Sequence, residues 1–173
     1  GVFELADREI SLVVSGFNHG ENVGSCVTVS GTIGAALEAA DLGYPALAVS
    51  LEIDASVKNK HEHRPDFSAA IHFLRLVARY ALEKDFPPDV RLIKVDIPSN
   101  ATIDSRWLVT VQDDLMYYKE SIEPRENPFN GKGLINATPS KGEYLGGDKI
   151  TDAYALAQGW VAVTPLSLNL TSR

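Results

Sequence analysis

Two short apolar runs flank a loop and a helix near the start of the chain, and this succession constrains the fold more than any other feature. The runs cover 11–14 and 46–50, and between them 32–41 carries apolar residues at helical spacing. The first run stops at Ser15-Gly16, as a buried strand does before a loop. Strand, loop, helix and strand in such quick succession are typical of a β-α-β crossover, which joins parallel strands. We therefore predict an α/β fold with a mainly parallel sheet flanked by helices.

The rest of the chain continues the α/β pattern and then departs from it. The remaining predictions are a helix at 66–82 after a polar loop at 51–65, a strand at 92–97, β structure at 107–118, hairpins and loops at 120–149, a helix at 151–158 and a strand at 160–164. We expect an α/β core built from 1–98 and 150–173. The intervening 99–149 is expected to form a β-rich extension.

Composition limits the class of partner. The formal net charge is -7 and the pI is about 5.0, which argues against binding a nucleic acid polymer, because such surfaces are basic. A small anionic substrate stays possible, because a metal ion can supply positive charge locally. The single cysteine, Cys26, favours a reducing, cytoplasmic setting. No apolar run is long enough for a membrane span, so no membrane partner is expected.

The loop after the first strand carries polar groups suited to ligand binding. Residues 15–24 read SGFNHGENVG and follow a predicted parallel strand, at the sheet edge where α/β proteins bind ligands. The amide oxygens of Asn18 and Asn22 could coordinate a hard cation such as Mg²⁺ or Mn²⁺, and their NH₂ groups could donate to a phosphate. Glycine and asparagine are also the default residues of turns, so these residues taken alone favour an ordinary turn.

A second candidate lies at the start of the first helix. Ser30-Gly31-Thr32 precedes the apolar helical pattern, and the free N–H groups of a helix start bind anions. Serine and threonine also cap helices without any ligand, and on these residues alone capping is the simpler interpretation.

Several segments together resemble one known family. SGFNHGENVG is followed by SGTIGAALEAA and GYPALAVSLE, which resembles the SurE pattern of S-G-x-N-x-G-x-N-x-G, a spacer, and S-G-T at the start of a helix rich in small residues. KVDIPSNA resembles the strand of that family that ends in N-I-P. ITDAYALAQGWVAVTPLSLNLT resembles its closing T-D…G-x-x-x-x-T-P-L…L-T segment. These segments occur in the same order as in the family, and they extend across most of the chain.

The resemblance implies a Rossmann-like SurE fold and a divalent-metal-dependent phosphatase acting on nucleoside 5′- or 3′-monophosphates. It implies that Asn18 is a metal ligand and that Asn22, Ser30, Gly31 and Thr32 surround the phosphate. It further implies one Mg²⁺ or Mn²⁺ per subunit and a homodimer or homotetramer.

The family's N-D-D-G motif, whose aspartates bind the metal, does not occur in this sequence. The catalytic residues therefore stay unidentified, and we expect the chain to be an N-terminally incomplete SurE-like domain. The basic residues of the family's T-R-x-x-x-R-x-Y segment are also not in place after Thr110. A non-catalytic α/β module for oligomerisation or ligand binding is the alternative hypothesis.

Two further groups of residues are interpreted as structural. His61-Glu62-His63 lies in a polar stretch and is expected to be a solvated loop rather than a metal site. Trp107, Tyr117 and Tyr118 could stack on a base, but packing in the extension or at a subunit interface is the expected role.

Overall fold

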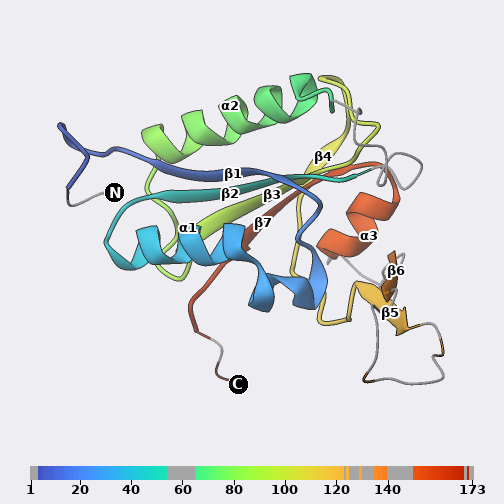
Figure 1. Ribbon diagram of the computed structural model, residues 1–173. Helices are drawn as coiled ribbons and strands as arrows, with labels where there is room; N and C mark the ends of the chain where they lie inside the picture. Colours follow the sequence, from blue (N-terminus) through green and yellow to red (C-terminus); the bar gives the residue numbers. More distant parts are fainter. Residues whose placement is uncertain are drawn as a thin grey trace.

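The computed structural model describes residues 4–53, 65–122, 124, 129, 135–139, 150–169 and 171. Its elements, labelled in Figure 1, are β1 (Val13–His19), the 3₁₀ helix η1 (Gly24–Val29), α1 (Gly31–Asp41), β2 (Ala46–Leu51), α2 (Ser68–Glu83), β3 (Leu92–Ile97), β4 (Trp107–Val109), β5 (Tyr118–Ile122), β6 (Ile135–Pro139), α3 (Asp152–Ala157) and β7 (Val161–Leu166). His61-Glu62-His63 and most of the loop predicted at 51–65 lie outside the described residues.

The main sheet has the strand order β1-β2-β3-β7-β4. β1, β2 and β3 are parallel to one another, β7 is antiparallel to β3, and β4 is parallel to β7. Helix α2 covers one face of this sheet, whereas α1 and α3 lie on the other (Figure 1). The predicted α/β fold with a mainly parallel, helix-flanked sheet is thus confirmed.

Successive side chains of the central strands point to opposite faces of the sheet, so the hydrophobic core has one part on each face. On β2, Leu47 and Val49 pack in the cluster beneath α2, while Ala46 and Ala48 pack in the cluster beneath α1. Both β2 and β3 are buried along their whole length, which is why β2 appears in the sequence as an apolar run. The small residues on the α1 side let that helix lie close to the sheet.

β1 continues beyond the predicted stop at Ser15-Gly16, so the predicted end of this strand was wrong. Ser15 pairs with Ala48 and Asn18 pairs with Ser50, so β1 carries one residue more than β2 over this interval. Such a bulge needs a backbone that only glycine adopts readily, and Gly16 has a φ of +130°. The strand therefore resumes after the glycine and delivers Asn18 to the end of the sheet.

The C-terminal half differs from prediction in its strand bounds. Of the β structure predicted at 107–118, only 107–109 and Tyr118 are strand, and β4 joins the main sheet although it falls within the predicted extension. β7 continues through Pro165, although proline cannot donate a backbone hydrogen bond. This is possible because β4 pairs with β7 only as far as Val163, which leaves the β4 side of β7 unpaired at Pro165. The predicted division of the chain into a core and an extension, with boundaries at 98 and 149, stays a prediction.

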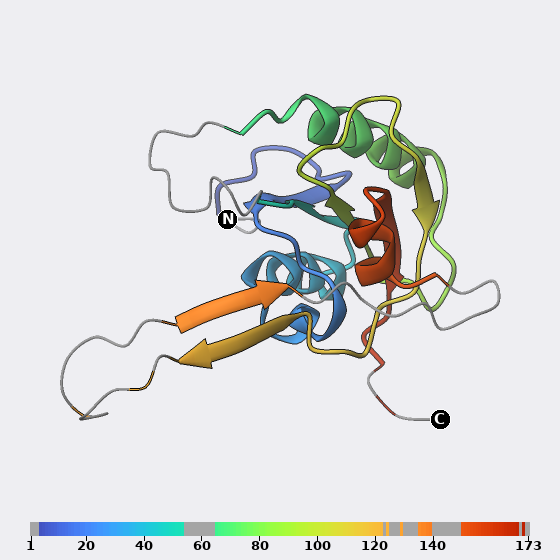
Figure 2. The same ribbon diagram turned by 90° about the vertical axis from the view of Figure 1, so that its right-hand side faces the viewer.

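β5 and β6 form a separate two-stranded hairpin, and Figure 2 shows it projecting from the body of the molecule. A lone hairpin has little stability of its own in water.

Among the described residues, no helix combines the length and the apolar character that crossing a membrane requires. A cytoplasmic location and a homodimer or homotetramer stay predictions.

Candidate active site at the carboxyl edge of the sheet

The predicted site residues gather at one edge of the sheet. β1, β2 and β3 are parallel, so their carboxyl ends at His19, Leu51 and Ile97 lie side by side. The chain leaves β1 at this edge and passes through η1 to the start of α1 (Figure 1). Figure 2 looks onto this edge. Ligands of open α/β sheets bind in this position.

Asn18 is partly buried at the end of β1, and its amide is oriented by a local bond. Its Nδ2 donates to the carbonyl oxygen of Gly20 at 2.6 Å. This bond assigns the NH₂ group to the turn and leaves Oδ1 as the atom that could coordinate a cation. An amide oxygen fits a hard divalent ion, but such ions take about six oxygen ligands. Asn18 therefore fits the predicted role as one ligand of a larger set.

Asn22 is held inside the protein. The residue is only 8% exposed, its Nδ2 donates to Ser50 Oγ at 2.7 Å, and its backbone N–H donates to Asp96 Oδ1 at 2.7 Å. These bonds fasten the loop after β1 to the ends of β2 and β3. A direct contact between Asn22 and a phosphate stays a prediction, whereas its anchoring of the loop is observed.

Ser30 caps α1. Its Oγ accepts a hydrogen bond from the backbone N–H of Ile33 at 3.2 Å, and its carbonyl oxygen accepts from Gly34. The capping interpretation is thus confirmed. It does not compete with anion binding, because the N–H groups of Gly31 and Thr32 belong to the first turn, which has no intrahelical acceptors for them. A Cβ on Gly31 would meet no described atom within 4 Å, so the space beside this turn is open.

A buried group of three charges beneath the site was missed by the sequence reasoning. Lys94 and Asp96 on β3 and Asp152 at the start of α3 all have side chains that are 0% exposed. Lys94 Nζ lies 2.5 Å from Asp96 Oδ2 and 2.9 Å from Asp152 Oδ2. One buried ammonium thus bridges two buried carboxylates.

Burial and ion pairing shift the pKa values of Lys94 and Asp96 in opposite directions. Burial alone would lower the pKa of Lys94, but the carboxylates of Asp96 and Asp152 outweigh it and hold that pKa above its ordinary value. Burial raises the pKa of Asp96, and Lys94 offsets only part of that rise. Lys94 is therefore charged at neutral pH.

Asp152 gathers backbone from three segments. Its carboxylate accepts from Gly24 N at 3.2 Å, from Asp113 N at 2.9 Å and from Ala153 N at 2.7 Å. Asp113 is itself buried, and within the described part of the chain its Oδ2 has no hydrogen-bond partner. Gly24 and the segment around Asp113 are therefore positioned by the same carboxylate.

Glu21 links the loop to the base of the hairpin. It is buried, and the hydroxyl of Tyr118 donates to its Oε1. The neighbouring Tyr117 packs with Val23 and with residues of α3, so it packs against the core rather than within the extension as predicted. Burial raises the pKa of both tyrosines, and Glu21 adds to the rise.

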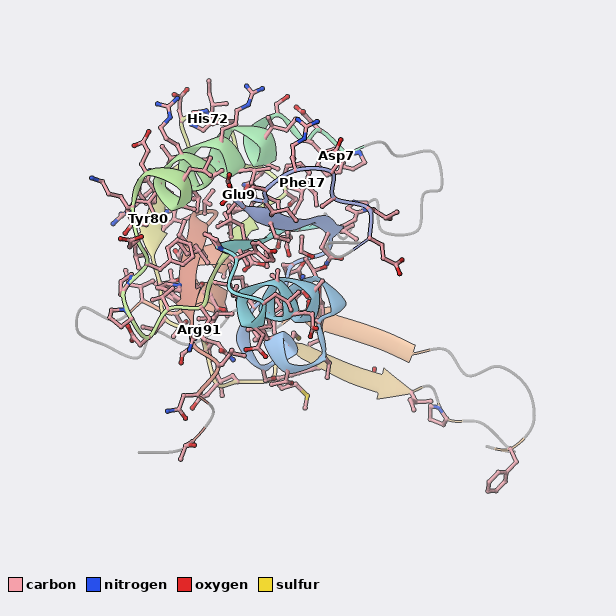
Figure 3. The ribbon with its side chains drawn as sticks, turned by 90° about the vertical axis from the view of Figure 1, so that its left-hand side faces the viewer. Asp7, Glu9, Phe17, His72, Tyr80 and Arg91 are labelled. Carbon is pink, nitrogen blue, oxygen red and sulfur yellow. The ribbon has the colours of Figure 1, made fainter. Side chains whose placement is uncertain are left out.

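Other titratable groups lie away from this edge. His72 is exposed on the outer surface of α2, and Arg91 precedes β3 at the opposite edge (Figure 3). Over the described stretches, which include 4–53 and 65–122, no three His, Cys, Asp or Glu side chains are placed to hold a metal ion. The role of Asn18 as a metal ligand therefore stays a prediction.

Comparison with known proteins decides the family. The family model described as Survival protein SurE matches residues 1–119. The 5′-nucleotidase SurE of Thermococcus gammatolerans is 38% identical over 169 residues, which cover 94% of this chain and 60% of that protein. The 5′-nucleotidase SurE of Thermococcus kodakarensis is 37% identical, with 99% of this chain and 66% of that protein covered. The chain belongs to the SurE family.

A solved structure agrees with this assignment. The SurE protein from Aquifex aeolicus superposes with a TM-score of 0.68 at 29% sequence identity, covering 95% of this chain and 62% of that one. This SurE-family chain spans 60–66% of the length of the two 5′-nucleotidases just named. Its place in the family and its fold are thus supported independently.

A signal for the charge group was present in the sequence. The apolar strand Leu92–Ile97 contains two opposite charges, Lys94 and Asp96, which are two residues apart and therefore on one face of the strand. Charges inside a buried strand are almost always paired. In this SurE chain, Asp96 also stands where the family motif N-I-P has asparagine. The third member, Asp152, has no such signal, because only folding brings α3 to β3.

Proposed function

We propose that this chain is part of a SurE enzyme that hydrolyses nucleoside 5′- or 3′-monophosphates with the help of one divalent metal ion per subunit. The observation that carries the proposal is the meeting of two groups at one sheet edge. The Oδ1 of Asn18 is free of the turn bond that its amide makes, and the first turn of α1 starts beside open space. Relatives named 5′-nucleotidase SurE share this part of the sequence.

The residues of this chain would bind and orient the substrate. The N–H groups of Gly31 and Thr32, with the positive end of the α1 dipole, would hold the phosphate. Asn18 would supply one oxygen ligand to Mg²⁺ or Mn²⁺. When bound, the ion would polarise a phosphate oxygen and lower the pKa of a water molecule. The aspartates of the family's N-D-D-G motif, absent from this sequence, would complete the ligand set.

The test is phosphate release from nucleoside monophosphates by the full-length protein in Mn²⁺ or Mg²⁺. We expect release that stops on chelation with EDTA and returns when Mn²⁺ is restored. The rates of release from 5′- and 3′-monophosphates, and from nucleotides that carry different bases, identify the preferred substrate. Release that continues in EDTA would contradict the metal requirement, and a folded protein that releases nothing would favour the non-catalytic module.

Asn18→Ala tests the metal ligand directly. Loss of one ligand should weaken the apparent affinity for Mn²⁺ by about tenfold or more, so activity falls at limiting Mn²⁺ and recovers partly at high Mn²⁺. The matched control is Asn169→Ala, because Asn169 is exposed and follows β7 at the opposite edge of the sheet. Equal dependence on Mn²⁺ in both variants would remove Asn18 from the metal site.

A further inference from the structure

The buried charge group points toward the site loop rather than toward solvent. Asp96 Oδ2 contacts Lys94, and its other oxygen accepts from Asn22 N at 2.7 Å. Asp152 Oδ2 contacts Lys94 at 2.9 Å and also accepts from Gly24 N at 3.2 Å. Each carboxylate thus joins the buried ammonium to one backbone amide of the loop.

This arrangement sets the path of the chain between the two candidate ligand sites. Asn18 ends β1, and α1 begins shortly after Gly24 through η1. Residues 22–24 therefore connect the predicted metal ligand to the predicted phosphate site. The amides of Asn22 and Gly24 are fixed to Asp96 on β3 and to Asp152 on α3, respectively.

Stability alone gives a poor account of such a group. Replacing a buried ion pair by apolar residues is often neutral or stabilising, because the charges must be stripped of water. The observed contacts instead achieve something that apolar residues cannot, which is to hold two backbone N–H groups in set positions. Groups behind a ligand that fix its orientation commonly affect affinity or activity by about 10–100-fold.

We propose that Lys94, Asp96 and Asp152 are positioning residues, which hold the loop 22–24 and thereby fix Asn18 relative to the start of α1. The inference rests on the proposed function, since it assumes that this edge binds metal and phosphate. The placement of the loop itself can be tested without any activity.

The variants are chosen to separate position from stability. Lys94→Met keeps the length of the side chain and leaves two buried carboxylates unpaired. The double variant Lys94→Met/Asp96→Asn restores the net charge of the group, and its Asn oxygen can still accept from Asn22 N. Lys84→Met is the matched control, because Lys84 is exposed at the end of α2.

Three measurements are made on each variant: urea unfolding, amide hydrogen exchange at Asn22 and Gly24, and titration with Mn²⁺ and with inorganic phosphate. In Lys94→Met we expect the two loop amides to exchange faster than its change in global stability explains. We expect affinity for Mn²⁺ and phosphate to fall by about tenfold or more. The double variant should recover the protection of Asn22, and Lys84→Met should match the wild type.

The outcomes distinguish this inference from the proposed function. If the wild type binds neither Mn²⁺ nor phosphate, the proposed function fails, and amide exchange still decides whether the group positions the loop. If Lys94→Met is less stable but its loop amides follow global unfolding and its affinities are unchanged, the group is only structural and the inference is overturned. If Lys94→Met does not fold, the double variant decides, because unprotected Asn22 in a folded protein refutes the expected recovery.

Discussion

Gly16 allows β1 to pass its bulge and carry Asn18 to the sheet edge, so Gly16→Ala should be strongly destabilising. Gly16 has a φ of +130°, a region that other residues rarely adopt. A Cβ built there would lie 2.3 Å from the carbonyl oxygen of Val49, about 0.7 Å short of the 3.0 Å that real Cβ atoms need. That oxygen belongs to the backbone of the buried strand β2, so it cannot turn aside as a flexible side chain would.

The expected cost has two parts. Holding a non-glycine residue in such a conformation costs about 1–3 kcal/mol. Forcing backbone to shift in a packed region costs about 1–3 kcal/mol more. Gly16→Ala should therefore lower the free energy of unfolding by about 2–6 kcal/mol, a large share of the roughly 5–15 kcal/mol typical of a domain. For a chain of this size, each kcal/mol lowers Tm by about 2–4 °C.

Urea and thermal unfolding, followed by circular dichroism, measure this cost. The control is Gly34→Ala, since Gly34 lies within α1 and a Cβ there would meet no described atom within 4 Å. Alanine should stabilise that position by about 0.5–1 kcal/mol, so the two substitutions should shift stability in opposite directions. A Gly16→Ala protein within about 0.5 kcal/mol of the wild type would refute the reasoning, because it would show that β1 does not need this backbone.

Three further results are expected. In Gly24→Ala, a Cβ would lie 2.7 Å from the carbonyl oxygen of Leu115, so urea unfolding should show a loss of about 1–3 kcal/mol, and an unchanged midpoint would contradict the contact. Ser30→Ala should lose about 1 kcal/mol through the missing cap, whereas Ser30→Thr should keep most of it in the same assay. Burial and Glu21 raise the pKa of Tyr118 above its ordinary 10.0, so the stability that its neutral hydroxyl contributes is present below about pH 10 and is lost as the pH rises above it. The urea midpoint should therefore fall less steeply between about pH 8 and 11 in Tyr118→Phe, and equal slopes would show that Tyr118 titrates normally.

The sequence predicted elements whose signal is local. The helices around Ile33 and Phe73 show apolar spacing, and Ser30 caps its helix as expected by accepting from Ile33 N. Thr151 caps α3 in the same way by accepting from Tyr154 N. These features depend on residues three or four positions apart. For that reason a periodic pattern is enough to find them.

The features that were missed depend on contacts between distant segments. The extension of β1 past Gly16 follows from its pairing with β2 and from the carbonyl of Val49, neither of which is visible in 11–19 alone. The last strand was predicted to end at 164, but β7 continues through Pro165 to Leu166, because β4 is too short to pair with this part of β7. The link from Lys94 to Asp152 joins residues 58 positions apart, so no local pattern could reveal it.

The structural and ligand-binding interpretations of Asn18 and Ser30 are compatible, because different atoms serve the two roles. The Nδ2 of Asn18 makes the turn, and its Oδ1 stays available for a cation. The Oγ of Ser30 caps α1, and the first-turn N–H groups of the helix stay available for an anion. Asn22 differs, because both its backbone N–H and its Nδ2 already donate inside the protein. Of the two asparagines in the motif, Asn18 is therefore the better candidate for ligand contact, and Asn22 acts chiefly by holding the loop that presents it.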